Sequence, residues 1–197
     1  MNGRILTINC KKIKENIESI KGLTSNSKLL LIAKANGYGL GAEEICKHLS
    51  SELDFIGVAT IEEAVSIRNS GVKTPILLLT EPGHENLKII SSYDISITVH
   101  KKETIKEIEA FSKKENVCIK THFKIDTGMT RLGSPWKDND NLKSWEKSSN
   151  LIIKEGIYSH FANSDNVNEL NNIQLDRFIN ITKDHSMIKH FANSDAI

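Results

Sequence analysis

Two strings in this sequence place a reactive side chain beside glycines. In KANGYGLG, Lys34 follows the apolar run Leu29–Ile32, and three glycines fall within the next seven residues. Glycines at that density predict a turn in which the backbone can approach a ligand closely. A partly desolvated lysine amine at a strand end can condense with an aldehyde cofactor or abstract a proton. The alternative interpretation is a lysine that extends its charged end from the strand into solvent.

The second string, KIDTGMTRLG, begins at Lys124 and places Arg131 beyond a turn at Thr127 and Gly128. A guanidinium in that position can donate hydrogen bonds to a phenolate, a carboxylate or a phosphate with a fixed fork geometry. The alternative is a structural ion pair between Arg131 and Asp126. The residues alone leave both possibilities open.

The string HFANSD occurs twice, at His160–Asp165 and at His190–Asp195. This repetition is consistent with one turn chemistry used at two strand ends, but it is too short to indicate a repeat architecture. A lone histidine at a strand end, such as His160, is more often structural than catalytic. A small hydroxyl residue at the end of a seventh strand, such as Ser194, lies where barrels commonly hold a phosphate.

Composition excludes several classes of partner. The 197 residues suffice for one sizeable domain or most of a larger one, and the net charge is +1 from 26 basic and 25 acidic residues. This balance predicts no nucleic-acid or anionic-membrane partner, and no apolar run suits a membrane span or a signal peptide. The three cysteines, Cys10, Cys46 and Cys118, lack metal-binding spacing. We therefore expect a cytoplasmic protein with reduced, mostly buried thiols and no metal site.

Apolar runs and polar amphipathic stretches alternate along the chain. The runs predict strands at Leu29–Lys34, Asp54–Ala59, Pro75–Thr80, Ile95–Val99, Val117–Asp126, Leu151–His160 and Met187–Phe191. The intervening stretches predict helices at Ala42–Ser51, Ile61–Ser70, Glu85–Ser92, Lys102–Lys114, Asn141–Ser148 and Glu169–Lys183. Before them, Arg4–Asn9 is strand-like and the next segment predicts a helix that Gly22 closes. Thr60 is a predicted helix cap, because acidic residues follow it in the first turn.

Repeated β-α units of this spacing predict parallel strands with right-handed crossovers. Seven strands could form an open doubly wound sheet, whereas eight would close a (β/α)8 (TIM) barrel. A seven-stranded arrangement leaves two unpaired edges. We therefore expect an α/β fold with an incomplete (β/α)8-type barrel of about seven strands.

Together these strings resemble the alanine racemase family. AKANGYGLG is similar to the family's lysine motif AVVKANAYGHG, with Gly37 for the common alanine and Leu40 for the common histidine. KIDTGMTRLG is similar to KxDTGMxRLG, GIYSHFANSD to GLxTHFATAD, and HFANS to HxANSAA. The opening ILTINCKKIKENI also resembles the family's EIDLDAIRHNI. The matches occur in the family's order and span nearly the whole chain.

The resemblance implies a pyridoxal 5'-phosphate enzyme with Lys34 as the catalytic, cofactor-linked lysine. The further cofactor-binding residues that it implies are Tyr38, Arg131, His160, Asn193 and Ser194. Arg131 would face the phenolic oxygen, His160 would orient an arginine that faces the pyridine nitrogen, and Tyr38 and Ser194 would contact the phosphate. Lys124 matches a lysine that is carbamylated in many members and supports the arginine. Asp195 replaces the family's more common alanine, and its carboxylate would repel a nearby phosphate unless it points away.

The resemblance also implies what this chain lacks. Residues 1–197 match the family's N-terminal barrel portion up to the eighth strand, without the C-terminal β domain with which residues 1–10 would pair. That domain supplies a tyrosine as the second catalytic base, and none of Tyr38, Tyr93 and Tyr158 matches it. A racemase needs proton removal on one face and delivery on the other.

We therefore expect an alanine racemase that interconverts L- and D-alanine for the cell wall, a homodimer at full length. This chain itself is expected to have impaired or no activity. The alternatives are a non-catalytic pyridoxal-phosphate-binding barrel, a racemase of another amino acid such as serine or lysine, or a degenerate chain without function.

Overall fold

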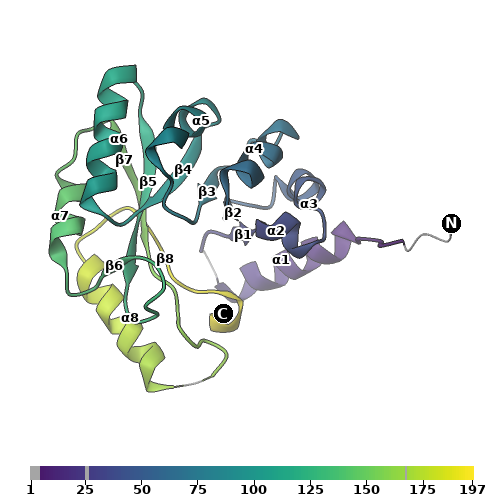
Figure 1. The fold of residues 1–197 in the computed structure, drawn as a ribbon. Helices are drawn as coiled ribbons and strands as arrows, with labels where there is room; N and C mark the ends of the chain where they lie inside the picture. Colours follow the sequence, from purple (N-terminus) through teal and green to yellow (C-terminus); the bar gives the residue numbers. More distant parts are fainter. Residues whose placement is uncertain (1–4, 25–26, 167) are drawn as a thin grey trace. The chain divides into compact units, whose positions relative to one another are not determined.

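A computed structural model describes residues 5–24, 27–166 and 168–197 (Figure 1). The chain divides into two compact units, Met1–Ile76 and Leu77–Ile197, and strand β3 (Ile76–Leu78) crosses the boundary. The elements of the first unit are α1 (Cys10–Thr24), β1 (Leu30–Ile32), α2 (Lys34–Tyr38), α3 (Ala42–Leu49), β2 (Phe55–Val58) and α4 (Ile61–Asn69).

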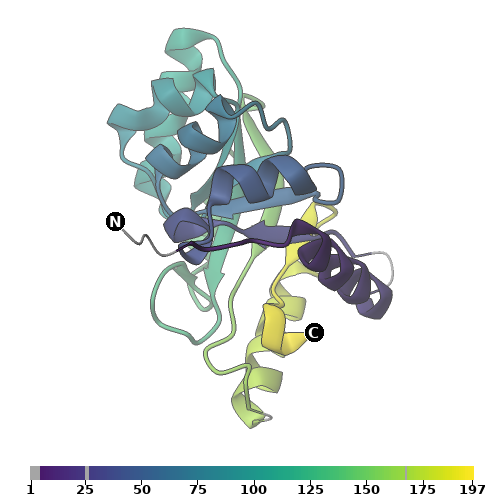
Figure 2. The ribbon, with the colours of Figure 1, turned by 90° about the vertical axis from the view of Figure 1, so that its right-hand side faces the viewer.

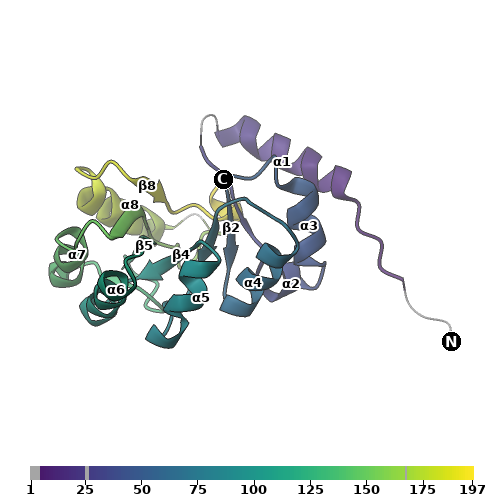
Figure 3. The ribbon, with the colours of Figure 1, turned by 90° about the horizontal axis from the view of Figure 1, so that it is seen from above.

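The first unit is built around the parallel pair β1 and β2, in which Leu31 is the register partner of Ile56. Helix α1 packs beside α3 (Figures 2 and 3). Strand β2 is buried throughout, whereas the residues of β1 are only half-buried. Helix α1 continues two residues past Gly22 to Thr24, since the cost of a glycine in a helix is modest.

The second unit holds the remaining elements. They are η1 (His84–Asn86), α5 (Leu87–Ser92), β4 (Ile95–Val99), α6 (Lys102–Glu115), β5 (Ile119–Asp126), β6 (Ser134–Pro135), α7 (Asn139–Glu146), β7 (Ile152–Tyr158), α8 (Glu169–Thr182), β8 (Ile188–His190) and η2 (Ser194–Ala196). Strands β4, β5, β7 and β8 pair in that order and all run parallel, while the short β6 pairs with the end of β5. Figure 3 shows α5, α6 and α7 along the outer side of these strands.

The two faces of this sheet differ in polarity. Along β4, Ile95, Ile97 and Val99 alternate with Ser96 and Thr98, all of them buried. In β5, Thr121 and Phe123 are in register with Ile97 and Val99 and pack with Trp145 of α7. The apolar side of each strand therefore faces the helices, and the opposite face carries polar side chains.

The predicted parallel β/α architecture is confirmed. In the described part of the chain, seven strands alternate with helices, apart from the short β6, and β4 has its predicted bounds. Residues 5–9 form neither helix nor strand, because α1 begins at Cys10, while residues 1–4 of the predicted opening strand lie outside the described residues. Within the described ranges, no helix is long and apolar enough to cross a membrane.

The cysteines only partly match the expectation of buried thiols. Cys46 is buried, and burial raises the pKa of its thiol to about 11. Cys10 is half-buried, whereas Cys118 is exposed because it lies in the loop between α6 and β5. The expectation is therefore wrong for Cys118.

Candidate functional site

Lys34 begins an unusual turn two residues after β1. Ala35, Asn36 and Gly37 have φ values of 52°, 54° and 62°, and Tyr38 has a φ of 56°. Side-chain-bearing residues in this left-handed region cost on the order of 1–2 kcal/mol each, so the turn is strained. Lys34 is half-buried, and its Nζ atom lies 5.9 Å from the centre of the exposed Tyr38 ring. The structure thus places two of the predicted site residues together.

Two side chains hold this turn, one from within it and one from outside. The Asn36 Oδ1 atom accepts the Ala42 backbone N–H at 2.9 Å, which ties the turn to the start of α3. The Glu63 Oε1 atom accepts the Ala35 N–H at 2.6 Å. The other Glu63 oxygen accepts the Thr60 N–H at 3.1 Å, and the Glu63 N–H donates to Thr60 Oγ1. This reciprocal capping box confirms the predicted helix start at Thr60 and also fixes the turn after Lys34.

In the second unit, Asp126 organises the DTGMTR turn. Its Oδ1 atom accepts the backbone N–H groups of Gly128 and Thr130 at 2.9 and 3.0 Å. The carboxylate makes no ion pair with the exposed Arg131, so the structural alternative for that arginine is wrong. Because the Asp126 carboxylate accepts backbone N–H groups of the turn, the Arg131 guanidinium is available to bind another anion.

Lys124 is buried on the polar face of β5, and its Nζ atom lies 4.9 Å from the centre of the Tyr158 ring. The Tyr158 hydroxyl bonds Thr98 Oγ1 at 2.8 Å, and that oxygen donates to the Leu78 carbonyl. Burial raises the pKa of Tyr158, an effect that the Thr98 bond and the positive charge of Arg131 only partly oppose. Lys124 and Arg131 therefore both act on one buried, protonated phenol.

A partly buried polar chain continues from this phenol across the sheet. The His190 ring stacks on Tyr158 with centroids 4.4 Å apart, and its Nε2 atom lies 2.9 Å from His122 Nδ1. The His122 Nε2 atom lies 3.1 Å from Glu155 Oε2, which also accepts the Ser96 hydroxyl at 2.5 Å. Glu155 reaches His122 because it is the extra residue of a bulge in β7.

Burial and hydrogen bonding shift the pKa values of two groups in this polar chain, His190 and Glu155. Burial, together with the charges of His122 and Lys124, lowers the pKa of His190 to about 3. Burial raises the pKa of the Glu155 carboxyl, but the bonds from His122 and Ser96 outweigh that effect, so the net shift is downward. The polar chain thus combines a neutral His190 with an ionised Glu155 at neutral pH.

The remaining predicted residues lie at the ends of β7 and β8. His160 is half-buried, and its carbonyl accepts the Gln174 side-chain amide at 3.1 Å. The Asn193 Oδ1 atom is buried and has no hydrogen-bond partner in the described structure, whereas Ser194 and Asp195 are exposed. The two HFANSD strings meet, because the Phe161 and Phe191 rings are in contact, tilted by 36° with centroids 4.0 Å apart.

Sequence reasoning missed most of the polar chain. His122, Glu155 and Ser96 belong to no motif, and Tyr158 was considered only as a possible second base. The strings ISITV and IKTHFKID did carry a signal, because polar residues alternate with apolar ones at the two-residue period of a strand. In the described residues, no group of three or more His, Cys, Asp or Glu side chains could hold a metal ion.

Comparisons with known proteins agree with this picture. The family model of the alanine racemase N-terminal domain matches residues 8–197. Alanine racemase 1 of Caldanaerobacter subterraneus subsp. tengcongensis is 36% identical over 94% of this chain and 50% of its own length. Alanine racemase of Mannheimia succiniciproducens is 35% identical over 100% of this chain and 55% of its own.

A solved alanine racemase from Clostridium difficile 630 is similar with a TM-score of 0.88 and 30% identity, covering 96% of this chain and 52% of the solved one. The chain thus spans about half the length of the curated relatives it matches. The family model covers nearly all of the chain, and the parallel β/α fold agrees with it. The chain therefore belongs to the alanine racemase family, of which it represents the N-terminal domain.

Proposed function

We propose that this chain is the cofactor-binding portion of a pyridoxal-phosphate-dependent racemase that interconverts L- and D-alanine. The observation that carries the proposal is the strained turn that begins at Lys34 and is tied down by Glu63 and Asn36. Strain of this kind persists where surrounding contacts enforce it, and it is concentrated at functional sites. Family membership supplies the reaction class.

The chemistry of the donors in each unit fits pyridoxal phosphate. The first unit offers the Lys34 amine and the exposed Tyr38 hydroxyl. The second unit offers the Arg131 guanidinium, the exposed Ser194 hydroxyl and the Asn193 side chain, whose amide NH2 group is a donor. Asp195 is exposed, so its carboxylate can remain solvated, which limits its repulsion of a phosphate.

In this proposal Lys34 would hold the cofactor and would carry the proton to and from one face of the alanine Cα. Bound pyridoxal phosphate supplies the electron sink that makes this proton removable. Tyr38, Asn193 and Ser194 would donate hydrogen bonds to its phosphate, and Arg131 would donate to its phenolic oxygen. Lys124, with or without carbamylation of its amine, would support Arg131. His160 would orient an arginine that faces the pyridine nitrogen of the cofactor.

The proton on the opposite face requires a second base. Tyr158 does not suit this role, because it is buried, hydrogen-bonded to Thr98 and held protonated by burial. We propose that the base comes from a further domain of the whole protein, in a cytoplasmic homodimer.

The test is an absorption titration of the protein with pyridoxal phosphate, followed by borohydride reduction and peptide mapping. The expected result is a cofactor mass on the peptide that contains Lys34, lost in Lys34→Ala. Lys28→Ala is a matched control, because Lys28 is an exposed lysine beside β1. Equal labelling of the wild-type protein and Lys34→Ala would contradict the proposal.

The unsuitability of Tyr158 favours a second candidate, a non-catalytic pyridoxal-phosphate-binding protein. Exchange in heavy water separates the two candidates. α-Deuterium in recovered L-alanine would show proton chemistry at Lys34, whereas cofactor binding without exchange would favour the binding protein. Parallel incubations with serine and lysine test the remaining substrate alternatives.

A further inference from the structure

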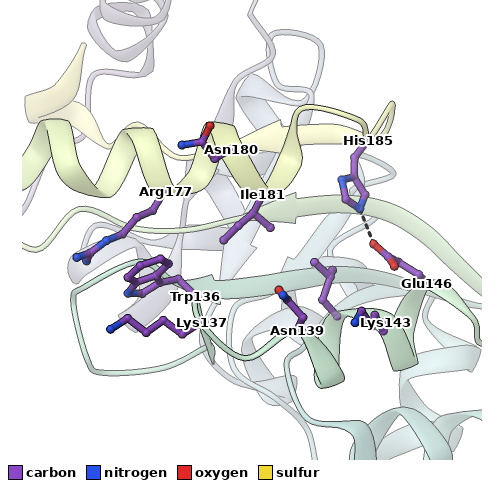
Figure 4. A pocket seen from close by; sticks show the side chains of 10 residues that line it. Trp136, Lys137, Asn139, Lys143, Glu146, Arg177, Asn180, Ile181 and His185 are labelled. Atoms are coloured by element: carbon purple, nitrogen blue, oxygen red, sulfur yellow. Dashed lines mark hydrogen bonds and ion pairs between the residues drawn. The ribbon is translucent and has the colours of Figure 1, made fainter.

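A groove between α7 and α8 of the second unit is separate from the residues of the proposed cofactor site (Figure 4). Its volume is about 590 Å³, which lies within the range of sites for small organic ligands. None of the residues proposed to bind the cofactor lines it. The groove therefore requires its own explanation.

One end of the groove is cationic and aromatic. The Arg177 guanidinium lies 4.3 Å from the centre of the Trp136 ring, and the Lys137 Nζ atom lies 5.2 Å from it (Figure 4). Arg177 Nη1 donates to the Thr127 carbonyl at 2.7 Å, so the guanidinium is held in place. Lys143 adds a third cation to the wall. Among the described residues, no carboxylate forms an ion pair with any of these cations.

The floor and the opposite end have a different character. Leu142, which is 8% exposed, and the half-buried Ile181 form an apolar floor. At the far end, Figure 4 shows His185 directed at Glu146, and the His185 Nε2 atom lies 2.8 Å from the carboxylate. The other ring nitrogen of His185, Nδ1, is buried and has no hydrogen-bond partner in the described structure.

We propose that this groove binds a small organic carboxylate with an apolar or aromatic body. The carboxylate would lie at the Lys137 and Arg177 end, and the body would lie over Leu142 and Ile181. Charge complementarity selects an anion, because three cations line the groove against the single carboxylate of Glu146. This site goes beyond the proposed racemase function and does not depend on Lys34.

The test is a two-dimensional ¹H–¹⁵N NMR titration of the 197-residue protein with 3-(4-hydroxyphenyl)propionate. The chain has two tryptophans, which provide an internal control. The indole signal of Trp136 is expected to shift, whereas that of Trp145, which is fully buried and donates to Thr121, is expected to stay. The neutral analogue 3-(4-hydroxyphenyl)-1-propanol is expected to bind at least about fivefold more weakly, since it lacks the charge.

A second experiment removes two of the positive charges that line the groove. The double variant Lys137→Gln/Lys143→Gln is expected to weaken carboxylate binding about fivefold, while Lys106→Gln, an exposed lysine of α6 outside the groove, leaves it unchanged. Equal affinity for acid and alcohol, an equal loss in Lys106→Gln, or shifts outside the groove would overturn the proposal. Lys34→Ala must bind the carboxylate as wild type does, so failure here and failure of cofactor binding are distinguishable.

Discussion

The Glu63 carboxylate accepts the backbone N–H of Ala35 at 2.6 Å, one residue beyond the proposed catalytic Lys34. The same side chain caps α4 through the N–H groups of Ala59 and Thr60. One residue therefore joins a helix start to the strained turn of the site. A left-handed turn without such a hydrogen bond would return to a less strained conformation. The Glu63 carboxylate therefore determines the backbone direction after Lys34.

Glu63→Ala is expected to lower the free energy of unfolding by about 2 kcal/mol, because three backbone donors lose their acceptor. Amide hydrogen exchange at Ala35 should accelerate more than exchange in α3. The matched control is Glu62→Ala, whose side chain is exposed and lies one position away on the same helix. Similar exchange at Ala35 in both variants would show that Glu63 does not hold the turn.

Gly156→Ala tests the buried histidine pair. A Cβ atom at this position would overlap the His122 Nδ1 atom, which bonds His190. We expect a loss of about 3 kcal/mol in unfolding free energy and altered imidazole ¹⁵N shifts for both histidines. Gly22→Ala is the control, because its Cβ would meet nothing within 4 Å, and a helical alanine should stabilise α1 by about 0.5 kcal/mol. Unchanged imidazole signals in Gly156→Ala would contradict this packing.

Acid is expected to destabilise the protein through His190. Its pKa falls from 6.5 to about 3 on folding, so the unfolded chain binds more protons between these pH values. Stability that is full above pH 6.5 is then lost as the pH falls towards 3, by about 2 kcal/mol at pH 5 for this group. Urea unfolding across this range measures the loss, and His190→Gln should flatten the slope. An equal slope in that variant would assign the acid sensitivity elsewhere.

Gly133, at the end of the KIDTGMTRLG string, combines a φ of +131° with a close backbone contact. An alanine Cβ there would lie 2.7 Å from the Asp126 backbone nitrogen. Gly133→Ala is expected to cost at least about 3 kcal/mol, from both conformational strain and displacement of the Asp126 turn. Gly71→Ala shares a positive φ but meets nothing within 4 Å, so its cost should be about 1 kcal/mol. Thermal unfolding of both variants compares them, and equal costs would refute the packing argument.

The sequence by itself determined the parallel β/α architecture, because alternating apolar runs and amphipathic stretches are local patterns. The strand Ile95–Val99 and the helix start at Thr60 have the predicted bounds. The reactive strings around Lys34 and Arg131 could also be identified from the sequence, since each is a contiguous combination of glycines and one functional side chain. Their roles in binding a cofactor remain predictions.

Only the tertiary structure decided how distant polar residues combine. His122 contacts Glu155 and His190, which are 33 and 68 residues away along the chain. That contact depends on strand order, on register and on the bulge at Glu155, none of which a local pattern specifies. The left-handed turn after Lys34 is likewise held by Glu63, 28 residues from Ala35, because strained backbone persists only where distant contacts enforce it.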